Sequence, residues 1–515
     1  MNFSDVFKRP LSKAELNLLG KRELVELLTI FQTRENLLLQ LILNVAGLAG
    51  HLAEFSIAAS TRLSRMLDLI FGGSLKSKNR KKKPPKKAAK KKPESGKTLP
   101  SERYPNLPIV EVEIRSEHPP ICDCGHHMCE SKMRTTTERL EVQPKVYYIS
   151  RENQVIYTCE SCKNGIATAP AKPHIVPGSP YGDSFVLDVT LSKLCDLIPI
   201  NRWVSIAARQ GVEGIPPNSL HDFFRHLAIS LDPSYKRHVA EIKNFPGAML
   251  ADETRHNMME GSEKKSWYLW SFNTERGVVF QVEDTRAGDV ASNFLKTCMC
   301  HTLVTDAYRG YAKALAIVNE SRKDRNLPLM KKAYCNAHAR NNFMASAIKD
   351  TRVAKNIIWI YRIIFVLYRS YVDLQGQEFE QVHAKLSRAF LLIKRIAEKE
   401  KANLSTKSAL YQALDYYLTY YDGLTLFLTD RTIPMSNNRS ERTLRNPVIG
   451  RKVWYGTHAV ESARDQAKVL SLIESCKMLG VNPRKFTQDA VDRLHAGKVA
   501  LSPYEYWRAQ SNNSS

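Results

Sequence analysis

The chain has 515 residues, of which 43% are hydrophobic and 25% charged, and it carries a formal net charge of +24. This length corresponds to about three domains, and the composition is ordinary for a globular protein. The most apolar runs, 37–50 and 357–368, fall short of the ~20 residues of a membrane helix, which excludes a transmembrane protein. The excess of positive charge favours a polyanion as partner, and nucleic acid is the first candidate.

The N-terminus lacks the charged start, apolar core and cleavage site of a signal peptide in their usual order. We therefore expect a cytoplasmic protein with no membrane partner. In that compartment, the ten cysteines are expected to be thiols or metal ligands rather than disulfides.

Leucines recur at mixed three-and-four spacing between residues 11 and 70, and this pattern predicts a helical segment. The heptad is imperfect, so two interpretations stay open. The segment is either a coiled coil through which the chain self-associates or an amphipathic helix packed on its own chain.

Residues 76–92 read KSKNRKKKPPKKAAKKK, and eleven of these seventeen are Lys or Arg. Charge repulsion and two prolines argue against a fold, so the segment is predicted to be a linker. A solubilising tether is one interpretation, and an arm that follows DNA phosphates is the one we favour. The lysines expected to contact DNA are Lys81, Lys82, Lys83, Lys86 and Lys87.

Two pairs of cysteines lie in ICDCGHHMC at 121–129 and in YTCESC at 157–162. Short β-like runs surround them, and two thiolate pairs on neighbouring turns form a tetrahedral zinc site. One structural Zn²⁺ is therefore predicted in a zinc-ribbon-like unit, with unconnected buried thiols as the alternative. The predicted ligands are Cys122, Cys124, Cys159 and Cys162. The first pair departs from the usual C-x-x-C spacing, so Cys129, His126 or His127 could replace one ligand.

Alternating and helical patterns follow one another along the rest of the chain. Short strands are predicted within 109–170, in IVEVEIR, RLEVQPKVYYIS and QVIYTC, and helices within 181–243. From residue 247 the strand-like runs are GAMLADE, KSWYLWSFN, GVVFQVED and HTLVTDAYRG. Residues 352–427 and 459–495 are predicted to be helical.

Two of these strand-like runs end in an aspartate, Asp252 and Asp306. Taken singly, such residues are more often turn or cap residues, but neighbouring strands that end together would hold both carboxylates side by side. Glu441 follows in the basic stretch MSNNRSERTLRNP, which by composition alone suggests a solvated helix face. Three carboxylates can bind two Mg²⁺ ions for phosphoryl transfer on DNA. Nearby cations that could neutralise DNA phosphates are Arg442, Arg445, Arg451 and Lys452.

The chain resembles the IS66-family transposases of the DDE type. The motifs that carry this resemblance occur in family order from the cysteine cluster onward: LSKLCDLIPINRWVSIAARQGVE, ADET, SWYLW, TDAYRGY, CNAHARNNF, NNRSERTLRNPVIGRKVWYG and SARDQAKVLSLIESCKMLGVNPRKF. The resemblance implies a ribonuclease-H-like fold with an all-α insertion and a catalytic triad of Asp252, Asp306 and Glu441. It further implies two Mg²⁺ or Mn²⁺ ions per site and DNA partners, namely transposon terminal inverted repeats and target DNA. A homo-oligomer, small accessory proteins of the same element and a place at the bacterial nucleoid are also expected.

Several residues near the triad are predicted to support it. Cys335 and His338 lie at i, i+3 on one helix face, a spacing that could bind metal but offers only two ligands; a supporting motif and a plain core histidine are the other interpretations. Arg286 supports the site, meets DNA or forms a surface salt bridge. Asn437 and Asn438 are both expected to share a helix face with Glu441, where they position its carboxylate or contact DNA. The competing carboxylates are Asp284 and Asp289 in a turn, and Glu253, which should point to the opposite face of its strand.

The expected fold class is α/β and multidomain, with a ribonuclease-H-like mixed sheet. The expected parts are a helical N-terminal segment at 1–75, a basic linker at 76–104, a zinc-ribbon-like domain at 105–175, a helical DNA-binding or linker region at 176–245, the first part of the core at 246–350, an all-α insertion at 351–430, the core with the Glu helix at 431–458 and a C-terminal helical region at 459–515.

A DNA transposase that cuts element ends and joins them to target DNA is the function favoured by the sequence. A DNA-binding regulator with an inactive core is the first alternative, but it has no need of three carboxylates near DNA. A nuclease without strand transfer is the second, and it would share the triad.

Overall fold

The structure of the chain is a computed structural model that describes residues 99–104, 108–111, 123, 137–140, 145–158, 166–259, 266–347 and 352–512. The chain divides into two compact units. Among the described residues, the larger unit contains 174–197 and 221–512, and the smaller contains those of 99–173 together with 198–220. The predicted N-terminal helices, the basic linker and the four zinc cysteines lie outside the described residues.

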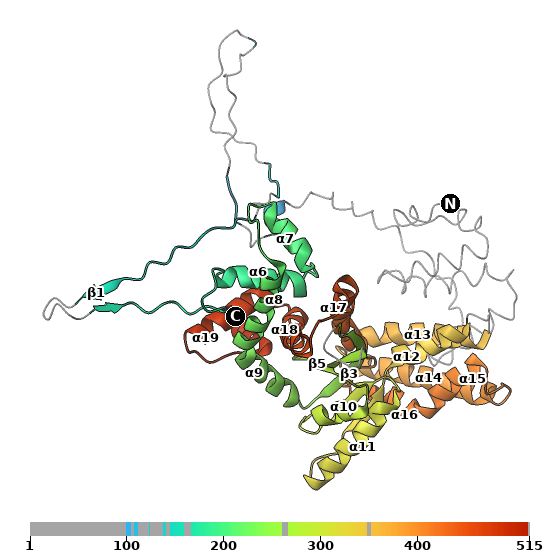
Figure 1. Cartoon of the computed structure of the whole chain (residues 1–515). Coiled ribbons are helices and arrows are strands. Elements are labelled where there is room, and N and C mark those ends of the chain that lie inside the picture. Colours follow the sequence, from blue (N-terminus) through green and yellow to red (C-terminus); the bar gives the residue numbers. More distant parts are fainter. Residues whose placement is uncertain are drawn as a thin grey trace. The chain divides into compact units, whose positions relative to one another are not determined.

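A five-stranded mixed sheet forms the centre of the larger unit (Figure 1). Its strands are β3 (Ala248–Asn257), β4 (Ser266–Thr274), β5 (Gly277–Glu283), β6 (Thr302–Thr305) and β7 (Lys331–Tyr334), in the order β5-β4-β3-β6-β7. Strand β4 is antiparallel to both of its neighbours, whereas β3, β6 and β7 are parallel. The first four strands were predicted from the sequence and are confirmed.

One face of the sheet is covered by α10 (Gly288–Leu295) and α11 (Arg309–Asp324). Met249 and Ala251 of β3 point to this side, where Phe272 of β4 stacks on Phe294 of α10 with ring centroids 4.0 Å apart. Leu250 points to the other side, because successive side chains of a strand alternate between faces. The sheet is therefore apolar on both faces in its centre and needs a cover on each.

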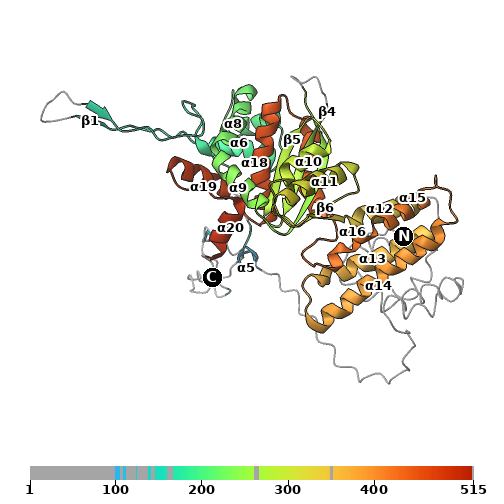
Figure 2. The ribbon, with the colours of Figure 1, turned by 90° about the horizontal axis from the view of Figure 1, so that it is seen from below.

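The second face is covered in part by an all-helical segment (Figure 2). Its elements are α12 (Asn336–Ala347), α13 (Arg352–Tyr371), α14 (Gly376–Lys401), α15 (Ala409–Thr419), α16 (Tyr421–Thr425) and a short 3-10 helix, Leu426–Leu428. The predicted helical region 352–427 is thus confirmed as helical and consists of several packed helices. The buried side chains of this segment join those of β3, β6 and β7 in one continuous core.

The rest of the larger unit is helical. Its described helices are α6 (Asp183–Leu194), α9 (Asp232–Lys243), α17 (Asn438–Trp454), α18 (Val460–Met478), α19 (Pro483–His495) and α20 (Pro503–Asn512), together with the part of α8 (Pro217–Ser230) from residue 221 onward. The predicted helical runs within 181–243 and 459–495 are confirmed. None of the helices in the described ranges is both long and apolar enough to cross a membrane.

The smaller unit contains two short antiparallel strands, β1 (Ile156–Thr158) and β2 (Ile166–Thr168), with the helices α5 (Pro100–Arg103) and α7 (Ile200–Ala208). β1 falls within one predicted strand. The strand expected from RLEVQPKVYYIS is wrong where it is described, because residues 139–140 and 145–150 are irregular. Ile149 is 95% exposed there, so the alternating pattern of this run has no apolar surface to pack against.

Strand β5 is fixed to α9 and α18 by a buried polar contact. His238 of α9 is fully buried, and its Nε2 lies 2.9 Å from the carbonyl oxygen of Val278 and 3.0 Å from Oγ of Ser475. The Val278 amide in turn donates to Ser475 Oγ at 2.9 Å. Burial lowers the pKa of His238 to about 4, so this imidazole is neutral in the folded protein at neutral pH.

The buried His238 is expected to make the free energy of unfolding depend on pH. The unfolded chain protonates His238 near the ordinary pKa of 6.5, whereas the folded chain does so only near 4, so stability falls as pH drops through that window. Between pH 7 and pH 5 the loss assigned to this residue is about 2 kcal/mol. Denaturant unfolding at both pH values should show it in the wild type and not in His238→Gln. Equal pH dependence in the two proteins would contradict the assignment.

Candidate active site

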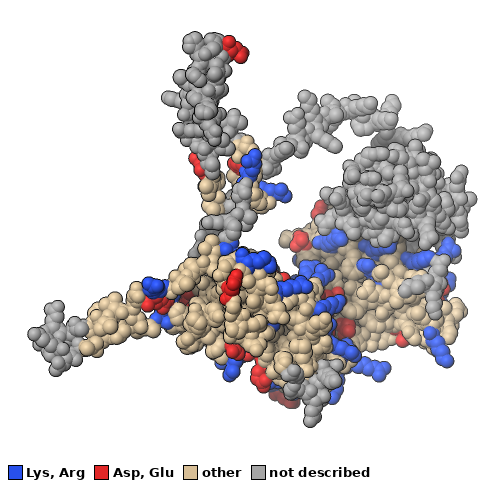
Figure 3. Space-filling model, turned by 45° about the horizontal axis from the view of Figure 1, so that its top comes forward, with Lys and Arg blue, Asp and Glu red and all other residues tan. Residues whose placement is uncertain are grey.

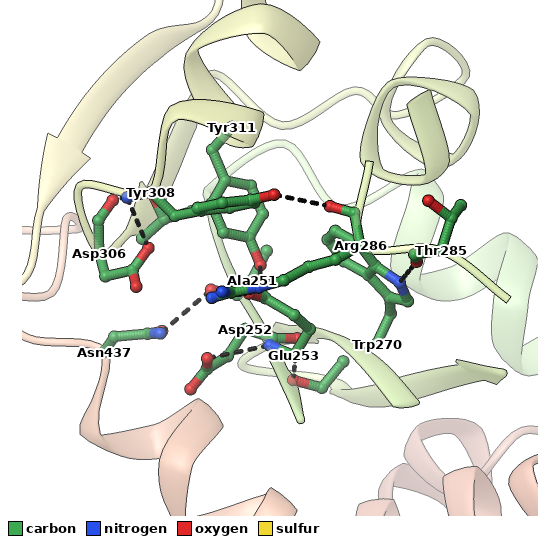
Figure 4. Close-up of polar contacts among 12 residues, drawn as sticks. Ala251, Asp252, Glu253, Trp270, Thr285, Arg286, Asp306, Tyr308, Tyr311 and Asn437 are labelled. Carbon is green, nitrogen blue, oxygen red and sulfur yellow. Dashed lines mark hydrogen bonds and ion pairs between the residues drawn. The ribbon is translucent and has the colours of Figure 1, made fainter. Parts of the chain in front are cut away.

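Asp252 lies within β3, just beyond the residues that pair with β6, and Asp306 directly follows β6. The expectation that the first strand ends at Asp252 is wrong, because β3 continues to Asn257 through its pairing with β4. The parallel pairing of β3 with β6 aligns Leu250 with Val304. Asp252 and Asp306 each lie two residues after this aligned pair, so the two aspartates are neighbours. Asp252 Oδ1 accepts the amide N–H of Glu253 at 2.9 Å, and Asp306 Oδ1 accepts that of Tyr308 at 3.0 Å (Figure 4). Both side chains are thereby held by their own local backbone.

Glu441 reaches the same place from the first turn of α17. Directly before that helix, the buried Asn437 donates from its side-chain amide to the carbonyl oxygen of Ala251 at 3.0 Å. This bond joins the start of α17 to the residue that precedes Asp252. The position of the Glu441 carboxylate is therefore fixed by a contact to β3, the strand that carries Asp252.

A buried polar network holds α17 against β4 as well. Ser440 Oγ lies 2.8 Å from Ser271 Oγ and 3.0 Å from the side-chain amide nitrogen of Asn273. Thr443 Oγ1 donates to Asn273 Oδ1 at 3.1 Å, and Ser271 Oγ donates to the Asp252 carbonyl at 3.2 Å. None of these supporting residues was predicted from the sequence. Ser271 and Asn273 alternate with Trp270 and Phe272 in SWYLWSFNT, and that alternation was the available signal.

The three carboxylates influence one another electrostatically. Burial raises the pKa of Asp252 to about 7, and the neighbouring charges of Glu253, Asp306 and Glu441 raise it as well. Negative charges brought together in a partly buried place are stable when cations or protons neutralise them. Hard carboxylate oxygens are the ligands that Mg²⁺ and Mn²⁺ prefer, so this donor set fits such ions.

Glu253 takes no part in this convergence because it points to the other side of β3. Its carboxylate accepts hydrogen bonds from Tyr311 Oη at 2.5 Å and from Arg286 Nε at 2.7 Å, and its side chain is only 2% exposed. The Arg286 guanidinium also lies over the ring of Tyr308, 4.1 Å from its centre. Arg286 therefore forms an ion pair with a buried carboxylate next to Asp252.

Two other predicted supporting residues, Cys335 and His338, lie beside Glu441. The Cys335 thiol is buried and accepts the backbone N–H of Asn437 at 3.1 Å. His338 Nδ1 lies 3.6 Å from Glu441 Oε1. Of the two asparagines expected beside Glu441, Asn437 makes the supporting contact, whereas Asn438 is exposed at the first position of α17.

The competing acidic residues lie elsewhere. Asp284 and Asp289 are both exposed, and Asp289 lies 3.6 Å from Lys313 Nζ. Neither is among the charges that raise the pKa of Asp252. The geometry thus separates them from the three carboxylates that converge.

Basic side chains continue from Glu441 along α17. Arg442, Arg445 and Lys452 are exposed at spacings of three and seven residues, which places them along one face of the helix, and Arg451 is half-buried. Figure 3 shows many Lys and Arg side chains on the view that it presents, with fewer Asp and Glu. The exposed cations along α17 suit the approach of phosphates to the carboxylates.

Comparison with known proteins gives a family match over the same region. A family model described as "Transposase IS66 family" matches residues 178–465, which is more than half of the chain. Two similar proteins of Sinorhizobium fredii are both described as uncharacterized. Protein y4jD is 26% identical over 412 residues, covering 77% of this chain and 78% of its own length. Protein y4hP is 23% identical over 434 residues, covering 78% of this chain and 76% of its own.

Proposed function

Because this chain belongs to the IS66 family of transposases, we propose that it cuts DNA at the ends of a transposable element and joins the freed 3′ ends to target DNA. The observation that carries this proposal is the convergence of Asp252, Asp306 and Glu441 from three separate elements at one sheet edge. A purely DNA-binding protein has no use for three carboxylates where the phosphate backbone must approach.

We further propose a ribonuclease-H-like core. Support comes from the three antiparallel strands that begin the sheet, followed by two parallel strands on the other side of β3. The all-helical segment between β7 and α17 is then an insertion into that core. Its position accounts for the 134 residues that separate Asp306 from Glu441.

Each group of residues in the site has its own proposed role. Asp252, Asp306 and Glu441 would hold two Mg²⁺ or Mn²⁺ ions, which activate the attacking oxygen and stabilise the leaving one. Asn437, Ser440 and Ser271 keep Glu441 at a fixed place relative to β3. Arg442 and Arg445 on the exposed face of α17 would contact the DNA phosphates.

The direct test uses purified full-length protein with a DNA duplex that carries an element end. With Mg²⁺ or Mn²⁺ present, we expect strand cleavage at the end and, with target DNA added, joined products. Cleavage without joining, even with accessory proteins supplied, would favour a nuclease without strand transfer. Binding without any cleavage under the same conditions would favour a regulator.

We propose that one structural Zn²⁺ is bound by Cys122, Cys124, Cys159 and Cys162, all outside the described residues. Metal analysis of the full chain should find this zinc, and Cys159→Ser with Cys162→Ser should lower the zinc content by one ion per chain. Loss of a zinc ion upon Cys129→Ser but not upon Cys122→Ser would show that the ligand set is wrong.

For the basic linker we propose non-specific DNA affinity through counterion release. Deleting residues 76–92 should reduce the slope of log affinity against log salt by up to ~0.9 for each DNA phosphate that the linker neutralises in the intact protein. The preference for element ends over random DNA should change little, since phosphate contacts carry no sequence information. Fluorescence anisotropy over a salt series measures both, and an unaltered slope would show that the linker is only a tether.

A further inference from the structure

A second group of possible metal ligands lies next to the acidic residues. It consists of Cys335, His338 and Glu441, whose ligand atoms all lie within 4.8 Å of one another. Only Glu441 has a part in the proposed chemistry. The other two bring a sulfur and a nitrogen donor, which the catalytic carboxylates do not offer.

Local structure explains why these side chains meet. Cys335 directly precedes α12, and His338 lies three residues later in the first turn of that helix, so both are on one face. Glu441 is held near them by the segment before α17, in which the backbone N–H of Asn437 donates to Cys335 Sγ at 3.1 Å. Two residues from one helix start and one from another thus approach a common point.

The surroundings of Cys335 suit a thiolate once a metal is bound. Without a metal the pKa of the thiol is raised overall, because burial and the nearby Glu441 carboxylate raise it, while the backbone N–H groups of Asn437, His338 and Ala337 that point at the sulfur lower it. These donors and the start of α12 stabilise negative charge on sulfur. A metal ion supplies the rest of the driving force, because a coordinating thiol loses its proton.

His338 supplies the second observation. Its Nδ1 is buried and has no hydrogen-bond partner among the described residues, although it lies 3.6 Å from Glu441 Oε1. That separation is too long for a hydrogen bond. The side chains of His338 and Glu441 are 38% and 45% exposed, so an ion could enter from solvent and bind between them.

We propose that Cys335, His338 and Glu441 form a site for a borderline transition metal such as Zn²⁺, separate from the acidic pair Asp252 and Asp306. Thiolate and imidazole ligands favour Zn²⁺ over Mg²⁺, and three protein ligands leave a fourth position for water. Binding at this site does not depend on the proposed transposase activity. One consequence rests on the proposed transposase activity. An ion bound at this site uses the Glu441 carboxylate as a ligand and therefore competes with the catalytic ions for that carboxylate.

Cobalt is the suitable probe, because Co²⁺ bound by a thiolate absorbs strongly in the near ultraviolet. The experiment uses the full chain in which every cysteine of the predicted zinc-ribbon unit is replaced by serine, namely Cys122, Cys124, Cys129, Cys159 and Cys162. Stripped of metal and titrated with Co²⁺, this protein should bind one ion with thiolate absorption. Adding Cys335→Ser should abolish that absorption, and His338→Ala should weaken binding at least ~10-fold. Cys195→Ser, which changes a half-buried thiol directly after α6, should alter neither.

Thiolate absorption that survives Cys335→Ser would overturn the proposal, as would binding of equal strength in the His338→Ala protein. Serine keeps an acceptor for the Asn437 amide, and circular dichroism establishes that each variant is folded. Asp252→Asn and Asp306→Asn should keep the cobalt signal. A protein that fails to cut DNA yet keeps this signal therefore refutes only the proposed function, whereas cleavage without the signal refutes only this site.

Discussion

Replacing Asp252 or Asp306 by Asn, or Glu441 by Gln, is expected to slow cleavage of element-end DNA by ~10³-fold or more. Each change keeps the shape of the side chain and removes one of the negative oxygens that are proposed to bind metal. The fold should persist, and DNA affinity should hold or rise slightly, since a charge that repels phosphate is gone. Single-turnover cleavage assays measure the rate, and anisotropy measures the affinity.

Asp284→Asn and Asp289→Asn are the matched controls, because both carboxylates are exposed and lie outside the convergent group. Each should retain most of the wild-type rate. Glu253→Gln is a poorer control, since Glu253 is buried and bound to Arg286 and Tyr311. Wild-type cleavage by the Glu441→Gln protein, together with an inactive control variant, would disprove the assignment of the triad.

The second large effect is expected on stability, upon Arg286→Met. The change removes the cation that pairs with the nearly buried Glu253 carboxylate and leaves the hydrogen bond from Tyr311 in place. Removing one partner of a buried ion pair is costly, and since Arg286 itself is 45% exposed, we expect a loss of about 2 kcal/mol in the free energy of unfolding. Denaturant unfolding with and without the substitution measures this loss.

A double-mutant cycle separates the ion pair from other roles of Arg286. The Arg286→Met protein should regain much of its stability when Glu253→Gln is added, because no charge is then left unpaired. If both substitutions were additive, the ion pair would not be the cause of the loss. Arg286 would then stabilise the protein chiefly through its contact with Tyr308.

Much of the sheet could be predicted from the sequence because its strands are long enough to show a pattern. The runs that became β3, β4, β5 and β6 were identified, and the mixed α/β architecture followed. Strand β7 was missed, since its four residues, KKAY, include two lysines and only Ala333 is buried. Such a strand exists because β6 offers it a parallel partner, which no local pattern reveals.

The candidate site was accessible to sequence reasoning only in part. Asp252 and Asp306 could be placed together, because each lies two residues beyond the last pair, Leu250 and Val304, that joins β3 and β6 as parallel neighbours. Glu441 was chosen on two grounds, the two aspartates expected side by side and the family resemblance, because its own stretch suggests only a solvated helix face. That Asn437 rather than Asn438 faces the strand depends on where α17 begins, and helix boundaries are the least certain part of such a prediction.

Because of the all-helical insertion, the ribosome synthesises β3 and β6 well before it reaches Glu441. At ~5–20 residues per second, the ribosome needs on the order of ten seconds for the 134 residues between Asp306 and Glu441. During that interval the face of β3 and β6 that carries Leu250 and Val304 still lacks its cover. A chain whose synthesis stops within the insertion therefore lacks Glu441 and has an uncovered apolar sheet face, which chaperones and proteases can bind.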